Sequence, residues 1–406
     1  MRKRERTKKM TKVLEQDKIP YTDVVKLTKE MVGIKSFSFM ENQEEEISKY
    51  ILDFFLKYDI EAYRTEIVPG RYNTFAILKG EDSENNPSLL LTGHMDTVPA
   101  YDFKEAFTAR EDEEYIYGRG SCDMKGALAA MMCAMVHLKE SGVRLKGDLI
   151  FCGVADEEEA GIGTESLIQT GPEAAYAVIG EPTKLEIALG HKGLEWIEIS
   201  FKGKKVHGGA QKDGVNAIMM AGRFLHKLET EYLPVLEKRT HPVLGTATLN
   251  IGTITGGDQP STVADKCSIR LDRRCLTDET ITQVYEELQA ICDELHEEDP
   301  KFEAEIRDVF NGETMPHIPF CTEEDSPLVK AAQNALAEEG TEPVLTCFPA
   351  WSDAGFMNAL TKSECIVLGP GDLSVAHSIH EKISKKQLAD AVKVYEHMAK
   401  ELCQTV

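Results

Sequence analysis

Two hydrophobic periods alternate along the chain, one typical of helices and the other typical of buried strands. Three segments have helical amphipathic spacing, and four short apolar runs have the length of strands. The helical segments are 22–32, 44–58 and 125–141, and the strand-like runs are 74–79, 88–92, 148–155 and 175–180. Apolar strands that alternate with helices predict an α/β domain whose sheet is covered on both faces.

The pattern changes near residue 194. Residues 194–203 alternate apolar and polar side chains, as a half-exposed antiparallel strand does. The next segments are typical of a helix, two strands, a helix and a strand, at 215–233, 247–254, 266–274, 279–298 and 301–310. The order βαββαβ is that of a ferredoxin-like unit. We therefore expect residues 194–309 to be inserted into an α/β domain formed by 21–193 and 310–406.

The first residues differ in composition from the rest. Residues 1–12 contain seven Lys or Arg and one acidic residue before any apolar period begins. We interpret residues 1–20 as a disordered basic tail, with Met10 as an alternative start. No apolar signal core follows this basic segment, and the longest apolar stretch, 126–138, is shorter than the ~20 residues that cross a bilayer.

Charge and cysteine content narrow the function classes. The formal net charge of −23 disfavours nucleic acid and anionic membranes as partners, because their phosphates attract cations. Ten cysteines are scattered without a CxxC pair, which is typical of reduced thiols and argues against a disulfide framework or a thiolate zinc site. We therefore predict a cytoplasmic protein.

Acidic and imidazole side chains recur just past the predicted strands. His94 and Asp96 follow the strand expected to end at Leu91, and the run 156–159 and Glu181 follow two more strands. Asp123 lies in a Gly-rich turn before a helix, and His377 follows a late strand. In an open α/β sheet this edge is where ligands bind.

Each of these residues alone is also compatible with a solvated loop or a helix cap. Together, however, so many carboxylates at one edge would repel one another unless positive charge lay among them. Imidazole and carboxylate ligands without thiolate favour zinc, with cobalt or manganese as alternatives. They are too many for one tetrahedral ion, so we predict two divalent ions that share a carboxylate.

Six ordered motifs carry a family resemblance. They are LTGHMDTVP, YGRGSCDMKGALAA, ADEEEAGIGT, GEPT, HGGAQKDGVNAI and GPGDLSVAHSIHE. In this order and spacing the chain, from about Val24 onward, resembles the zinc-dependent amidohydrolases and exopeptidases that include acetylornithine deacetylase, succinyl-diaminopimelate desuccinylase, aminoacylase and carboxypeptidase G. The implied fold is a mixed-sheet dinuclear-metal catalytic domain with an inserted ferredoxin-like lid and dimerisation domain.

The resemblance implies a role for each motif residue. The implied metal ligands are Asp123 as the bridge, His94 and Glu181 on one ion, and Glu158 and His377 on the other. Glu157 is similar to the family's general base, and Asp96 resembles the carboxylate that orients a histidine ligand. A cis peptide is implied between Asp123 and Met124.

The inserted segment is implied to contribute to the site and to assembly. His207 resembles a histidine that reaches the active site of the partner subunit in a homodimer formed through residues 194–309. Arg274 resembles an arginine that binds a substrate carboxylate. A solvated loop histidine and an edge-strand arginine remain the alternatives. Asp353 is a candidate for support behind the ligands, and His191 has no assigned role.

Several positions depart from the family pattern. Gly208 and Gly209 follow His207 where small hydroxyl residues are usual, and Ser261 stands in place of the common Asn of the lid. His380 and Lys382 occupy the variable places of the last motif. The metal set is intact while the substrate-facing set is altered, so the reaction class is better specified than the substrate.

The predicted activity is hydrolysis of the amide bond of an N-acyl amino acid by metal-activated water, with Glu157 as general base. A dipeptidase or carboxypeptidase-type exopeptidase with the same site is the alternative. Glu181 favours the deacylase, because family peptidases tend to have Asp at that ligand. A two-metal phosphatase would need more cationic groups near the metals, and a metal-dependent binding protein would have no use for Glu157.

Overall fold

An eight-stranded mixed sheet organises the larger part of the molecule. The computed structural model describes residues 23–310, 312 and 314–406, so the predicted tail of residues 1–20 lies outside the described residues. The strand order is β1–β2–β6–β3–β7–β18–β8–β17. Their bounds are Glu61–Val68, Arg71–Leu78, Leu149–Val154, Leu89–His94, Tyr176–Ile179, Glu364–Val367, Ile187–Ala188 and Leu345–Thr346. The four central strands β6, β3, β7 and β18 are parallel to their neighbours within this set.

Helices cover both faces of this sheet, as the apolar strands predict. One face packs against α2 (Val24–Gly33), α3 (Glu45–Lys57), α4 (Lys125–Ser141), α9 (Pro327–Glu338) and α11 (Lys385–Leu402). The opposite face packs against α5 (Ile162–Thr170) and α10 (Ala354–Leu360). Alternate residues of each strand therefore enter different cores, and both cores are buried.

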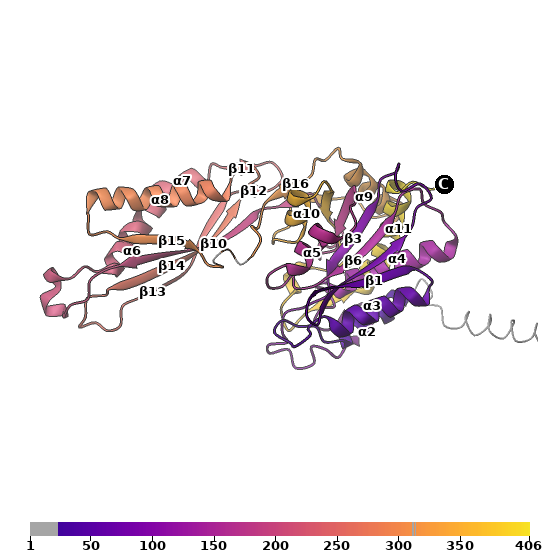
Figure 1. Cartoon of the computed structure of the whole chain (residues 1–406), viewed down its shortest axis with the longest axis horizontal. Helices are drawn as coiled ribbons and strands as arrows, with labels where there is room; N and C mark the ends of the chain where they lie inside the picture. Colours follow the sequence, from indigo (N-terminus) through magenta and orange to yellow (C-terminus); the bar gives the residue numbers. More distant parts are fainter. Residues whose placement is uncertain (1–22, 311, 313) are drawn as a thin grey trace, which may run out of the picture.

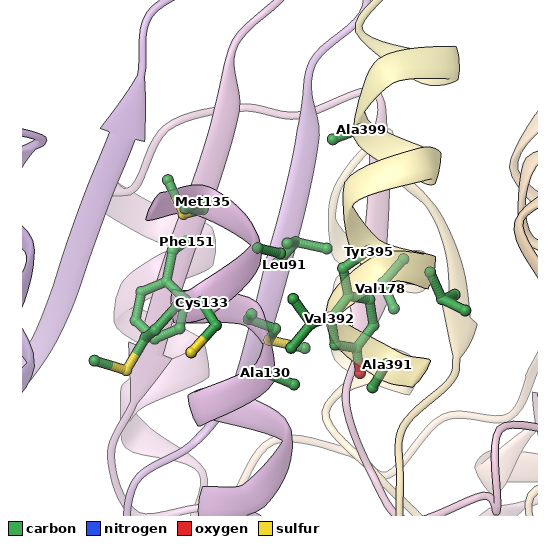
Figure 2. Close-up of a cluster of buried hydrophobic side chains, with 14 of the residues drawn as sticks. Leu91, Ala130, Cys133, Met135, Phe151, Val178, Ala391, Val392, Tyr395 and Ala399 are labelled. Carbon is green, nitrogen blue, oxygen red and sulfur yellow. The ribbon is translucent and has the colours of Figure 1, made fainter. Parts of the chain in front are cut away.

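Helix α4 is the most deeply buried helix of the first core. Its sequence is apolar on nearly every side, because strands lie on one side of it and α11 lies on another. Figure 2 shows Phe151 of the sheet next to Cys133 of α4, in one cluster with Leu91 of the sheet and Tyr395 of α11. The loop before α4 contains Asp123, so this packing fixes the backbone next to a predicted ligand.

The inserted segment forms a lobe beside the large sheet (Figure 1). Its elements follow the predicted order: β10 (Gly193–Lys202), α6 (Ala217–Lys227), β13 (Thr248–Gly256), β14 (Lys266–Cys275), α8 (Ile281–Glu298) and β15 (Ala304–Asp308). The strands form an antiparallel sheet in the order β13–β14–β10–β15, with β13 at one edge. Helices α6 and α8 share one core with this sheet. The predicted fold class, a mixed-sheet α/β domain with an inserted βαββαβ unit, is confirmed.

Some elements differ from the sequence predictions. Strand β3 does not end at Leu91 but continues to His94, because Gly93 and His94 still pair with β6. Strand β1 and the short helices α5 and α10 had no clear apolar period and were not predicted. No described helix is long and apolar enough to cross a membrane.

Candidate metal centre

The predicted ligands meet at one edge of the large sheet. His94 is the last residue of β3, while Glu157 and Glu158 follow the end of β6. Glu181 follows β7, and His377 follows β18 after a loop that contains the 3₁₀ helix Leu373–Val375. Since these four strands are parallel, their carboxyl ends lie on the same side of the sheet, as the sequence analysis predicted.

Asp123 lies between the two histidines. Its Oδ1 is 3.0 Å from Nε2 of His94, and its Oδ2 is 3.2 Å from Nε2 of His377. Each carboxylate oxygen therefore faces a different imidazole, which is the arrangement that a carboxylate shared by two ions requires. The peptide bond between Asp123 and Met124 is cis, in agreement with the prediction.

Further carboxylates surround each histidine. Glu181 Oε1 lies 3.7 Å from His94 Nε2, and both oxygens of Glu158 lie 3.2 Å from His377 Nε2. Ligand atoms of His94, Glu157 and Glu181 lie within 4.8 Å of one another, as do those of His94, Asp123 and Glu158. The Glu157 carboxylate therefore lies next to the predicted ligands His94 and Glu181.

Asp96 orients both a ligand and the loop that bears two more acidic residues. His94 Nδ1 lies 3.0 Å from the Asp96 carbonyl oxygen and 3.6 Å from its carboxylate, which leaves Nε2 free to face the centre. The Asp96 carboxylate also accepts the backbone N–H groups of Glu157 at 3.3 Å and Glu158 at 3.1 Å. Asp96 is fully buried, so these contacts are shielded from water.

The pKa values reflect an excess of negative charge. Burial raises the pKa of Glu157 and of Glu181 well above the usual value for a carboxyl, and neighbouring carboxylates add to this effect. Hydrogen bonds to Asp123 and Glu158 raise the pKa of His377 to about 10. Although burial opposes it, the two histidines hold the pKa of Asp123 below its usual value. Positive charge among these groups would relieve their repulsion.

The donor set fits a metal site. Both groups of candidate ligands include His94 and carboxylates without a thiolate, which is typical of zinc, cobalt or manganese sites in hydrolytic centres. His377 belongs to neither group, although its Nε2 lies 3.2 Å from Asp123 and Glu158. The His94 side chain is 1% exposed, whereas the His377 side chain is 51% exposed. One end of the centre is therefore closed by the protein and the other is open to solvent.

A buried ion pair supports the Asp123 backbone and was not predicted. Glu381 accepts the N–H groups of Cys122 at 3.2 Å and Asp123 at 3.3 Å, and it forms an ion pair with Arg119. Both side chains of the pair are almost completely buried. Glu381 stands in the same motif as His377, but sequence alone gave no sign that it reaches the turn before α4.

His207 and Arg274 belong to the inserted lobe and have no hydrogen bond or ion pair with the predicted ligands. The exposed His207 accepts the N–H of Gly209 through its own Nδ1, at 3.1 Å, and belongs to neither ligand group. Arg274 forms hydrogen bonds of 2.7 and 3.0 Å with the carboxylate of Asp272. Its charge contributes to lowering the pKa of His191, so it lies near the junction of the lobes.

Asp353 is buried beside the centre, and His191 is buried near the junction of the lobes. Asp353 accepts a 2.6 Å hydrogen bond from Thr164 and contributes to raising the pKa of Glu157 and Glu181. His191 Nδ1 lies 2.9 Å from the carbonyl oxygen of Lys192, and its Nε2 lies 3.1 Å from the carbonyl oxygen and 3.3 Å from the backbone nitrogen of Ser352. These contacts join the junction to the start of α10, and burial lowers the pKa of His191 to about 4, which favours a neutral ring.

Relatives and structural neighbours agree with this architecture. An acetylornithine deacetylase from Myxococcus xanthus is 31% identical, over 80% of this chain and 83% of the relative. A deformylase of N-formyl-4-amino-5-aminomethyl-2-methylpyrimidine from Bacillus subtilis is 26% identical, with 92% of each chain covered. A probable succinyl-diaminopimelate desuccinylase from Staphylococcus epidermidis is 27% identical, over 96% of this chain and 99% of the relative.

Solved structures show the same fold. A tripeptidase from Staphylococcus aureus superposes with a TM-score of 0.78 at 21% identity, over 95% of this chain and 99% of the neighbour. A dinuclear metal binding peptidase of the M20 family from Bacillus subtilis has a TM-score of 0.72 at 16% identity, over 95% and 99% of the two chains. The model of peptidase family M20/M25/M40 matches residues 90–401. The chain is therefore a member of the M20/M25/M40 family of hydrolases, and the predicted resemblance is confirmed.

Proposed function

We propose that this protein is a dinuclear zinc-dependent amidohydrolase that removes the acyl group from an N-acyl amino acid. The observation that carries the proposal is the position of Asp123, with one oxygen toward His94 and the other toward His377. Asp123 would be shared by two ions, of which His94 and Glu181 would hold one, and Glu158 and His377 the other. Cobalt or manganese would suit the same donors.

In this proposal Glu157 transfers the proton of the attacking water, and Asp96 holds the His94 ring in position. Bound divalent ions would supply positive charge that polarises the amide carbonyl and makes water more acidic. Glu157 accepts the proton from the attacking water and delivers it to the nitrogen of the leaving amine. Asp96 holds the His94 ring and the backbone of Glu157, so the base and the ligand keep a fixed relation.

The inserted lobe would complete the substrate site. We assign Arg274 to the substrate carboxylate, which would have to compete with Asp272 for the guanidinium. We assign His207 to the carbonyl oxygen in the active site of a partner copy, since its ring is exposed and forms no hydrogen bond with the predicted ligands of its own chain. The corresponding assembly is a homodimer through residues 194–309.

Two lines of support favour acyl removal over peptide cleavage. Glu181 occupies the ligand position where the family's peptidases tend to have Asp. The relatives at 26–31% identity are named as a deacetylase, a deformylase and a desuccinylase. An exopeptidase with the same machinery is the second candidate, because neighbours of the same fold are described as a tripeptidase and an aminopeptidase.

A substrate panel tests the proposal. Protein reconstituted with Zn²⁺, Co²⁺ or Mn²⁺ would be assayed against N-acetyl, N-formyl and N-succinyl amino acids beside dipeptides and tripeptides. We expect turnover of an acyl amino acid at least tenfold above that of any peptide, and none with Glu157→Gln. Faster cleavage of peptides would establish the exopeptidase instead, and inactivity toward both classes would contradict the proposal.

A further inference from the structure

The loop that bears Glu157 and Glu158 is held from two directions. On one side, the Asp96 carboxylate accepts the backbone N–H groups of both glutamates. On the other side, the preceding residue, Asp156, forms an ion pair with Arg71, with 2.7 Å between Oδ1 and Nη1. The Asp156 carbonyl oxygen also accepts the backbone N–H groups of Glu159 and Gly161 within the loop. Of the side chains in the two contacts, those of Asp96 and Asp156 belong to the family motifs, whereas Arg71 lies outside them.

Arg71 uses every nitrogen of its guanidinium group. Nε and Nη2 donate to the two oxygens of Glu44 at 2.7 and 2.5 Å, while Nη1 contacts Asp156. The side chain of Arg71 is 18% exposed, and those of Glu44 and Asp156 are 0% and 3% exposed. A planar fork that joins two buried carboxylates fixes their positions in a way that a single ammonium group does not.

This contact connects three separate segments. Arg71 is the first residue of β2, Glu44 immediately precedes α3, and Asp156 lies just past β6. Asp156 has a φ of 68°, in the left-handed region that residues other than glycine rarely occupy. Without Arg71, two buried carboxylates would lose their shared cation, and Asp156 would keep its backbone hydrogen bonds but lose the side-chain contact that helps to hold it in this conformation.

We infer that Arg71 is a positioning residue, which sets the direction of Glu157 and Glu158 by holding Asp156 in its left-handed conformation. The inference rests on the proposed function for the effects on metal binding and turnover, whereas the loop geometry can be measured without metal or substrate. It assigns Arg71 no contact with substrate or reacting atoms. Loss of Arg71 should weaken metal binding, because Glu158 would be displaced, and slow proton transfer, because Glu157 would be displaced.

Arg71→Met is the first test, with Arg64→Met as the matched control. Arg64 lies on the adjacent strand β1, has a side chain 20% exposed and contacts Glu45 and Ser48 near the same helix. It forms no hydrogen bond or ion pair with residues 155–161. In metal-free protein, hydrogen exchange of a peptide spanning 155–161 should accelerate in Arg71→Met and stay unchanged in Arg64→Met. Unchanged exchange in both variants would overturn the inference.

Metal binding and turnover supply the next readouts. Titration with Co²⁺ alone, followed by its visible absorption, should show one of two sites weakened about 10–100-fold in Arg71→Met. The kcat for the best substrate should fall about 10²-fold with little change in KM, because the loop carries the base and not a substrate contact. Arg71→Lys should recover part of both losses. Equal losses in Lys and Met variants, or a change in KM alone, would contradict the inference.

A double-mutant cycle separates positioning from general destabilisation. Asp156→Asn should reproduce the Arg71→Met effects on exchange and Co²⁺ affinity, and the double variant should be little worse than either single variant. Additive effects would show that Arg71 acts by another route. If no substrate is found for wild-type protein but the exchange and Co²⁺ results hold, the proposed function fails while the positioning role stands.

Discussion

The adjacent residues Glu157 and Glu158 have different proposed roles, general base and metal ligand. Glu158 contacts His377 and the ligand group that includes Asp123, so Glu158→Gln should leave about one divalent ion per chain in elemental analysis. Glu157→Gln keeps the side-chain shape but removes the proton acceptor. We expect it to retain two ions while kcat falls by at least roughly 10³-fold, near the upper range for a general base. Loss of an ion from Glu157→Gln but not from Glu158→Gln would mean that the two roles are exchanged.

Glu381 combines a structural and a positioning contact in one buried carboxylate. Removing it in Glu381→Ala leaves the Arg119 guanidinium buried without its counter-charge, and the amides of Cys122 and Asp123 without their acceptor. The free energy of unfolding should fall by about 3–5 kcal/mol in urea titrations. The exposed neighbour His380 provides the control, since His380→Ala should change stability by less than about 0.5 kcal/mol. Similar losses in both variants would argue against the buried ion pair.

At the scale of elements, His191 joins β9 (Gly190–His191) to the start of α10 as a neutral ring. Burial lowers the pKa of His191 to about 4. The unfolded chain therefore takes up a proton below pH 6.5 that the folded protein excludes, and stability is lost as the pH falls from about 6.5 to about 4. The loss from this residue should reach about 3 kcal/mol.

Chemical denaturation at several pH values checks this expectation. His191→Asn keeps a donor for the Lys192 carbonyl but cannot titrate, so its stability should fall less steeply on acidification than that of the wild type. His226→Asn, which changes an exposed residue of α6, should follow the wild-type slope. Parallel slopes in all three proteins would exclude a titrating His191.

Much of the element order could be predicted, because strands buried on both faces and helices with one apolar face have distinct periods. Helix α4 follows directly from its apolar run, and the change at residue 194 marks the inserted sheet. Strand β1 could not be recognised, since its residues are mostly exposed or half-buried. The end of β3 was placed too early because Gly93 and His94 do not resemble strand residues.

The candidate site was predictable where residues follow strands that the sequence reveals. His94, Glu158, Glu181 and His377 all satisfy that condition, and the structure brings them together around Asp123. The contacts of Arg71 with Asp156 and of Arg119 with Glu381 were not predictable, because their partners are far apart in the sequence and no local period links them. Such pairs depend on how whole elements pack.

For the whole molecule, the proposed homodimer makes a specific prediction. Strand β13 is an edge strand whose side chains are largely exposed, including Ile251 and Ile254, so it offers a surface for pairing. Sedimentation should give twice the mass of one chain.

If His207 acts across the dimer, mixing inactive His207→Ala and Glu157→Gln chains should restore part of the activity, because mixed dimers contain one intact site. Absence of recovery despite demonstrated subunit exchange would place His207 in its own site or outside the reaction.

The position of β18 in the sheet has a consequence for how the chain folds during synthesis. Strand β18 lies between β7 and β8, although the whole inserted lobe separates it from both of them in sequence. The lobe is built from one continuous stretch and can fold once residue 309 has left the ribosome. The large sheet cannot be completed until residues 364–367 have been synthesised, because β18 pairs with both β7 and β8. Its first core is completed later still, when α11 packs on α4. The metal centre is therefore assembled last, and ribosome-bound chains that end before β18 should expose apolar sheet edges to chaperones.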